Sequence, residues 1–186
     1  MKDFELLSTS GSWSEILDAC RSTVSKDFLN KEPSETFKWI WRNLPYWIST
    51  HFARHHIGFE KWISTQRNYR QDNYDREKAP QDAPVTFIGE GNTQALINMS
   101  KVRLCMAASP KTRAKMIELK KGINEIDPFV SWSMVPSCIY RGGCVEEGLG
   151  ANCHFYENFL KRHPEITVNT SIQERYDIYN QDFYKN

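Results

Sequence analysis

The feature that most constrains the fold is an alternating segment that passes directly into a helical pattern. Aromatic residues occupy every second position between 35 and 42, at Phe37, Trp39 and Trp41. Lysine, isoleucine and arginine fill the positions between them, so the segment is typical of a half-buried strand with one aromatic face. Pro45 then begins a segment with helical spacing that runs to His56, since proline is favoured at the first position of a helix.

Weaker patterns predict the other elements. In chain order these are a strand over 4–7, a helix over 12–25, a strand over 85–88 and helices over 109–127 and 155–162. The helix over 109–127 carries an apolar stripe that is expected to pack on the core: Met116, Leu119, Ile123 and Ile126. A long polar loop is expected over 66–84, an irregular segment from Pro136, and a weakly ordered tail toward Asn186.

The charge and length of the chain exclude several classes of protein. Its 186 residues are enough for one sizeable core, and 24 Lys and Arg against 23 Asp and Glu give a net charge of +1. A nucleic-acid polymer is therefore not an expected partner, because no bulk positive field is present. The sequence has neither an apolar run of membrane-span length nor the start typical of a secretory signal, which predicts a cytoplasmic protein without a membrane partner.

A cluster of basic and polar residues begins at the end of the expected helix and indicates a site for a phosphorylated ligand. Its members are Arg54, His55, His56, Ser64, Gln66 and Arg67. Guanidinium and imidazole groups suit phosphate because they donate charge-assisted hydrogen bonds. A surface helix with a solvated basic end is the alternative that this cluster alone leaves open.

A second motif lies downstream, where Asn92, Asn98 and Arg103 follow one another in a strand-to-helix pattern. Together the two motifs resemble the flavin-dependent thymidylate synthases. The signature of that family is Arg-His-Arg, two variable residues, Ser, one variable residue, Asn-Glu, one variable residue, Ser, one variable residue and Arg-Tyr. Arg54, His55 and Ser64 match it. In the family a strand ends in the first Asn, and the next helix carries the second Asn and the Arg at the spacing found here.

The sequence also departs from this signature. His56 replaces the second Arg, and Gln66 stands at the final Arg unless one residue is inserted and Arg67 takes that place. Where the family has Ser, Asn and Glu, this chain has Phe59, Lys61 and Trp62. His51 stands where the family commonly has a Gln that contacts the nucleotide. These changes alter the groups that would read the base.

The resemblance implies an α+β fold with a mixed or antiparallel sheet flanked by helices, assembled as a homotetramer with sites shared between subunits. The implied reaction is flavin-dependent methyl transfer to C5 of a deoxypyrimidine monophosphate, with FAD as cofactor, methylenetetrahydrofolate as donor and NADPH as reductant. dUMP is the first candidate substrate. Methylation, hydroxymethylation or hydroxylation of dCMP or another pyrimidine nucleotide is the alternative, because the altered residues can change how ring position 4 is read.

The resemblance also implies roles for single residues. Flavin binding is expected of Arg54, His55, His56, Asn92 and Asn98. Nucleotide binding is expected of His51, Ser64, Gln66, Arg67, Arg76 and Arg103. Arg103 would stabilise the negative charge that develops on a pyrimidine carbonyl, so Arg103 and Ser64 are the candidate catalytic residues.

The five cysteines are an odd number in what is expected to be a cytosolic enzyme, which argues against a disulfide framework. Three of them, with Gly-rich surroundings, lie in the region 131–186, which extends the domain of residues 1–130. A structural zinc site is one interpretation, with Cys105, Cys138, Cys144 and Cys153 as its ligands. The other is that the thiols are reduced and act as small hydrophobic groups.

Two hypotheses from other classes remain open at this point. A flavin- or nucleotide-binding module without catalysis would account for the altered signature. A zinc-stabilised protein- or nucleic-acid-binding domain would account for the cysteines and for the five cations between 111 and 121. Acidic residues interleave with those cations, which favours a solvated face. A yellow preparation would favour the enzyme or the flavin-binding module. A colourless preparation that contains zinc would favour the zinc-stabilised binding domain.

Overall fold

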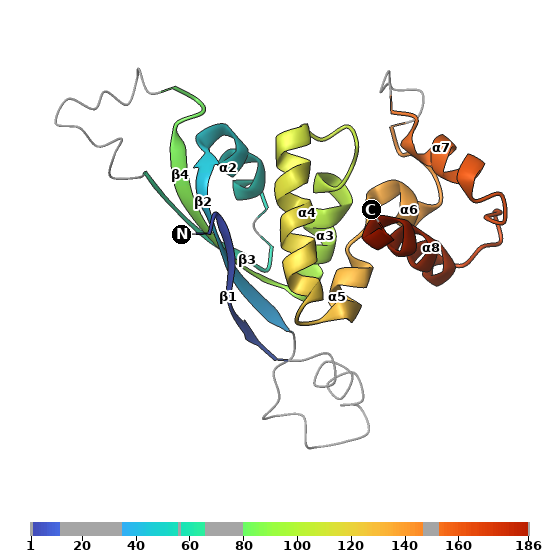
Figure 1. Cartoon of the computed structure of the whole chain (residues 1–186), viewed down its shortest axis with the longest axis horizontal. Coiled ribbons are helices and arrows are strands. Elements are labelled where there is room, and N and C mark those ends of the chain that lie inside the picture. The colour runs from blue at the N-terminus through green and yellow to red at the C-terminus, as the bar shows by residue number, and fades with distance from the viewer. Residues whose placement is uncertain (1, 12–34, 56, 66–79, 147–152, 186) are drawn as a thin grey trace. The chain divides into compact units, whose positions relative to one another are not determined.

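The computed structural model of the chain describes residues 2–11, 35–55, 57–65, 80–146 and 153–185 (Figure 1). The chain divides into two compact units, Met1–Leu96 and Ile97–Asn186, and the helix α3 (Thr93–Arg103) crosses the boundary between them. The first unit contains β1 (Phe4–Ser10), β2 (Thr36–Pro45), α2 (Tyr46–Ala53), β3 (Phe59–Thr65) and β4 (Pro84–Asn92). The second contains α4 (Pro110–Asn124), α5 (Pro128–Ser133), α6 (Ser137–Arg141), α7 (Phe155–Arg162) and α8 (Ile172–Lys185).

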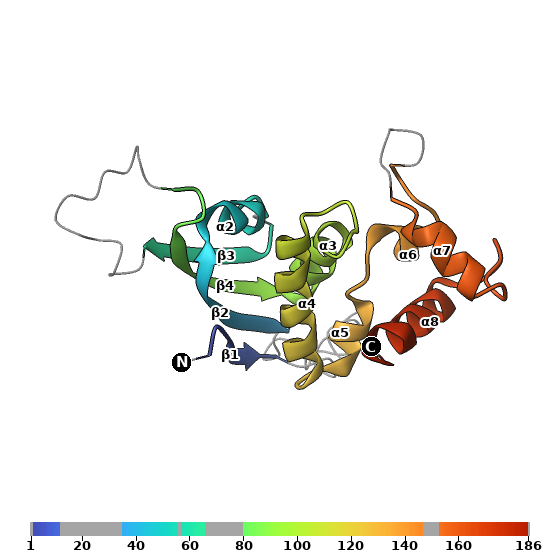
Figure 2. The same cartoon turned by 45° about the horizontal axis from the view of Figure 1, so that its top comes forward.

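The four strands form one antiparallel sheet in the order β1-β2-β4-β3 (Figure 2). β2 pairs with β1 on one side and with β4 on the other, so that Ile40 lies opposite both Glu5 and Ile88. β3 pairs with β4 along its whole length, from Phe59↔Gly91 to Thr65↔Val85. The expected α+β class is confirmed, and of the two expected sheet types the antiparallel one is present.

The aromatic face predicted for β2 is confirmed and forms the main packing layer of the first unit. Phe37, Trp39 and Trp41 are each 0% exposed. The Trp39 ring stacks on Phe59 of β3 with 5.6 Å between centroids, and Trp41 packs on Phe52 of α2 at 4.7 Å. Full burial of such side chains contributes roughly 1.5–3 kcal/mol each, so this layer stabilises the sheet by several kcal/mol in all.

The helix α2 is shorter than the sequence predicts. It begins after Pro45, as expected, and it buries Ile48 and Phe52. It ends at Ala53 instead of continuing to His56, because a turn must reverse the chain before β3 begins at Phe59. Arg54 is therefore the C-cap of the helix, and the basic cluster belongs to the turn that follows it.

The sequence does not predict β3, and it predicts only the first half of β4. Polar residues in β3 conceal its alternation, and two glycines in β4 have low strand propensity. Both glycines are explained by the aromatic layer. A Cβ atom on Gly89 would lie 2.5 Å from Cζ2 of Trp39, and one on Gly91 would lie 3.3 Å from Cδ2 of Phe59.

In the second unit, α4 follows the predicted stripe except at its end. Met116, Leu119 and Ile123 are each 0% exposed. Ile126 is 50% exposed, so its predicted place in the core is wrong. The helix ends at Asn124, and Asp127 then starts α5 by accepting hydrogen bonds from the backbone N–H groups of Phe129 and Val130 at 2.8 and 3.0 Å.

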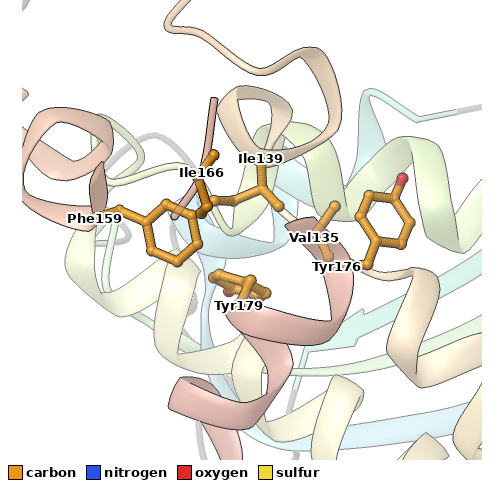
Figure 3. Packing of buried hydrophobic residues seen from close by; sticks show 6 residues of the cluster. All are labelled: Val135, Ile139, Phe159, Ile166, Tyr176 and Tyr179. Carbon is orange, nitrogen blue, oxygen red and sulfur yellow. The ribbon is translucent and has the colours of Figure 1, made fainter. Parts of the chain in front are cut away.

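The predicted weakly ordered tail is wrong, because residues 172–185 form α8. Arg175 holds this helix in place: its guanidinium donates to the carbonyl oxygens of Ile139, Tyr140 and Thr170 at 2.9, 2.9 and 2.6 Å. Tyr179 joins a buried cluster with residues of α6 and α7 (Figure 3). The bounds of α7 confirm the short helix predicted over 155–162, and this helix contributes to the cluster.

The helix predicted over 12–25 lies outside the described residues, as does most of the loop predicted over 66–84. None of the helices within the described ranges combines the length and the apolar composition that a membrane crossing requires.

A buried lysine lies where α4, α5 and α8 meet. Lys120 is 0% exposed, and its Nζ donates to Oδ1 of Asn180 at 2.7 Å and to the carbonyl oxygen of Ser131. The ring centroids of Phe183 and Tyr184 lie 4.9 and 5.3 Å from the same nitrogen. Within the described ranges no carboxylate pairs with it, and burial lowers the pKa of Lys120 to about 7.

This pKa predicts how stability changes with pH. Between pH 7 and 9 the folded Lys120 amine is increasingly neutral, whereas the same amine in the unfolded chain stays protonated, with a pKa near 10.4. The unfolded state then binds more protons, so the free energy of unfolding rises with pH, by on the order of 2 kcal/mol across this window. Denaturant unfolding at pH 7, 8 and 9 measures it.

Two variants make this test specific. Lys120→Met removes the titrating amine and should flatten the rise. Lys111→Met, which replaces an exposed lysine of the same helix, should leave it intact. Burial also raises the pKa of the Cys138 thiol to about 12, so this thiol opposes the trend from about pH 8 upward, where the unfolded thiol, with a pKa near 8.5, begins to lose its proton. A rise that persists in Lys120→Met would contradict the prediction.

Candidate functional site

The turn between α2 and β3 gathers several of the predicted ligand-binding residues. Arg54 caps the C-terminus of α2, and the backbone N–H of His55 donates to the carbonyl oxygen of Phe52 at 3.1 Å. Lys61, at the start of β3, donates from Nζ to the carbonyl oxygen of His55 at 3.1 Å. Cations at this end of a helix are stabilised by its dipole. An anion bound here would depend on the side chains, because the helix dipole itself opposes it.

Asn92 connects this turn to the second predicted motif. Its backbone N–H donates to the carbonyl oxygen of Gly58 at 3.1 Å. Its side-chain Oδ1 accepts from the backbone N–H of Ala95 at 2.9 Å, so it caps the N-terminus of α3. The predicted sequence order, in which a strand ends in Asn and leads into a helix, is therefore present.

Gly58 lies directly against the side chain of Asn92. A Cβ atom at this position would be 2.6 Å from Nδ2 and 2.8 Å from Oδ1 of Asn92, and the backbone has a positive φ of 65°. Only glycine satisfies both conditions without strain. The two motifs, which are distant in the sequence, thus meet through this glycine and this asparagine. Gly58 ends the basic stretch that the sequence singles out, and a glycine at such a place is a usable signal, but the sequence gives it no role in packing.

His51 occupies the last turn of α2, with its ring edge-on to Trp47 at 5.4 Å between centroids. It is partly buried. The imidazole therefore has one aromatic neighbour that restricts its orientation. A restricted ring can present a defined donor or acceptor, which is what reading a base edge requires.

Ser64 and Trp62 lie on the other face of the sheet. Successive residues of a strand point to opposite faces, and Phe59 faces the aromatic layer, so Trp62 and Ser64 face away from it. Trp62 is 49% exposed, with Nζ of Lys38 4.9 Å from its ring centroid. Lys61 and Trp62 both differ from the signature that the sequence resembles. Lys61 lies beside the turn between α2 and β3, whereas Trp62 lies on the opposite face of the sheet.

Four predicted site residues, His56, Gln66, Arg67 and Arg76, lie outside the described residues. In α3, Asn98 is exposed and Arg103 is the last helical residue. Arg103 also lines a cavity of about 300 Å³ within the second unit.

All four predicted zinc ligands line that same cavity. Cys105, Cys138, Cys144 and Cys153 are each partly buried. Burial raises the pKa of Cys105 and, to about 12, that of Cys138, and neighbouring cysteines contribute to both shifts. No group of three His, Cys, Asp or Glu residues in the described parts of the chain is arranged to hold a metal ion. The thiols therefore share a cavity without forming a finished metal site.

Comparison with known proteins gives one informative result. No protein-family model matches the chain, and no curated protein sequence matches it. Among solved structures, the chain is similar to a UMP/dUMP methylase, PolB from Streptomyces cacaoi, whose crystal structure contains bound 5-Br dUMP. The match covers 70% of this chain and 93% of the PolB chain, with 10% sequence identity and a TM-score of 0.56. At this identity the likeness concerns the fold.

The contact between Gly58 and Asn92 predicts the effect of a single methyl group. Gly58→Ala forces a left-handed backbone on alanine and displaces the Asn92 cap, which together should lower the free energy of unfolding by roughly 2–3 kcal/mol. Gly143→Ala is the matched control, because a Cβ atom there meets nothing within 4 Å. It should change stability by less than about 0.5 kcal/mol. Equal effects of the two substitutions, measured by denaturant unfolding, would show that the contact is not tight.

Proposed function

We propose that this chain is a flavin-dependent enzyme that transfers a one-carbon unit to C5 of a deoxypyrimidine monophosphate, with dUMP as the first candidate substrate. The observation that carries the proposal is the contact of Asn92 with Gly58. It joins the end of β4, which carries the first residue of the second motif, to the turn of Arg54 and His55. The fold shared with a UMP/dUMP methylase supports the same substrate class.

FAD is the proposed cofactor, and the residues of the turn suit it chemically. Arg54 and His55 would bind its phosphates, because both side chains donate charge-assisted hydrogen bonds. Asn92 uses Oδ1 to cap α3, so its Nδ2 would be the donor to a ring carbonyl, and Asn98 is exposed on the same helix. When bound and reduced by NADPH, the flavin supplies hydride, and methylenetetrahydrofolate supplies the carbon.

Arg103 is the proposed catalytic residue. Its guanidinium would stabilise the negative charge that develops on the O2 carbonyl of the pyrimidine when C5 becomes nucleophilic. His51 would read ring position 4, where uracil has a carbonyl and cytosine an amino group. The ring of His51 lies edge-on to Trp47, and a neutral imidazole presents a donor or an acceptor at a given nitrogen according to its tautomer. dCMP is therefore the second candidate substrate.

Ser64 gives a reason to propose sites shared between subunits of a homotetramer. It faces away from the side of the sheet on which α2 packs, so within one chain it cannot join the turn of Arg54. If Ser64 contacts nucleotide, it does so in the site of another copy. Sedimentation showing only monomer, with flavin bound, would contradict this arrangement.

The reaction itself is the first test. The protein, reduced and supplied with methylenetetrahydrofolate, should add a methyl or hydroxymethyl group to dUMP or dCMP, detected by mass spectrometry of the nucleotide. Omission of the folate is the control and should leave the nucleotide unmodified. If flavin binds but neither nucleotide is modified or changes the rate of flavin oxidation, a non-catalytic binding module replaces the enzyme proposal. If flavin does not bind, the enzyme proposal and the binding-module alternative both fail.

Point variants test the separate roles. Arg54→Ala and Asn98→Ala should weaken flavin binding, and Arg103→Ala should spare flavin and weaken nucleotide binding. Loss of a hydrogen bond to a charged group costs roughly 1.5–3 kcal/mol, or about one to two decades in Kd. Asn92→Asp keeps an oxygen for the N–H of Ala95 but removes the Nδ2 donor, so it should weaken flavin binding without lowering stability. Flavin and nucleotide titrations that give one profile for all four variants would refute the division of roles.

A further inference from the structure

We propose that Cys105, Cys138, Cys144 and Cys153 bind one thiophilic metal ion, zinc, in the cavity that they line together. Cys105 follows α3, Cys138 lies in α6, Cys144 follows α6 and Cys153 precedes α7. The chain thus brings thiols from four separate segments to one cavity of about 300 Å³. The proposal does not rest on the proposed enzymatic function, although Arg103, the proposed catalytic residue, also lines the cavity.

The chemistry of the lining selects the class of metal. Zinc in structural sites is tetrahedral, with sulfur ligands at about 2.3 Å, and four thiolates are one of its common ligand sets. Soft sulfur ligands disfavour magnesium and calcium, which prefer oxygen. Each thiol that binds releases its proton to solvent, so the four neutral thiols become four thiolates and no redox step is needed.

The charges around the cavity favour a thiolate cluster. Zinc with four thiolates has a net charge of −2. The lining includes two cations, Lys101 and Arg103, and one carboxylate, Glu146. The cations offset the charge of the cluster, and Glu146 opposes them in part. Nζ of Lys101 lies 4.1 Å from the ring centroid of Tyr140, which holds the amine near α6.

The thiols must approach one another when the ion binds. In the regions that the structure describes, the thiols are not yet arranged around one point. Three of them, Cys105, Cys144 and Cys153, lie outside helices, and Gly142 and Gly143 lie just before Cys144. Glycine lowers the cost of such an adjustment because it has no Cβ atom. Metal binding should therefore raise the stability of the second unit.

The first experiment measures metal in the full chain. Protein expressed with zinc and purified under reducing conditions should contain about one zinc per chain by plasma mass spectrometry. Cys138→Ser should lose most of it. Ser137→Ala, which changes the neighbouring residue of the same cavity without removing a thiol, should keep it. Folding of each variant is checked by circular dichroism. Equal zinc content in the two folded variants would overturn the proposal.

The second experiment needs no substitution. Cobalt titrated into the chelator-treated wild-type protein should give thiolate-to-cobalt charge-transfer bands and the visible bands of tetrahedral cobalt. Added zinc should protect the four cavity cysteines from alkylation, read by peptide mass spectrometry, and leave the labelling of Cys20 unchanged. Free thiols that label equally with and without zinc would overturn the proposal. So would disulfides among the four that persist in the purified protein under mild reductant.

Discussion

The close approach of the Trp39 ring to the backbone of Gly89 is the constraint on which the first unit depends. The indole of Trp39 occupies the space that a side chain at position 89 would need. β2 and β4 can therefore pair in this way only with glycine at position 89. The same ring stacks on Phe59, which fixes β3 against β4. Overpacking of such a contact typically costs about 1–3 kcal/mol. The position of β3, and hence of the turn before it, follows from this arrangement.

The elements that the sequence predicts are those whose side chains alternate or repeat clearly. Phe37, Trp39 and Trp41 identify β2 because their period is 2 and their apolar character is uniform. β3 and the end of β4 are not predicted, because polar residues interrupt the first and glycines the second. The glycines make room for aromatic rings that other strands supply. A glycine that accommodates an indole looks like a loop residue in the sequence. α8 escapes detection because its inner face is anchored by Arg175 and Asn180, whose partners are carbonyl oxygens and a lysine far along the chain.

The candidate site was predictable in its residue types and only partly in its geometry. The order of Asn92, Asn98 and Arg103 correctly places a strand end before a helix. It does not indicate that Asn92 has a structural task as the cap of α3, or that Gly58 must be small for that reason. Both facts depend on a contact between segments that are distant in the sequence, which no local pattern records. Arg103 has two possible tasks, since it is the proposed catalytic residue and also a cation beside the cysteines.

The buried amine of Lys120 has a chemical consequence beyond stability. A neutral amine is a nucleophile, but here the helix α8 and its aromatic rings cover it from every reagent in solution. An acylating reagent can reach the nitrogen only when α5 or α8 moves away from it. The rate at which Lys120 becomes acylated, relative to the exposed lysines of α4, is then a measure of how often the packing of α5 and α8 around it opens. Acylation of Lys120 thus reports local unfolding without any added label.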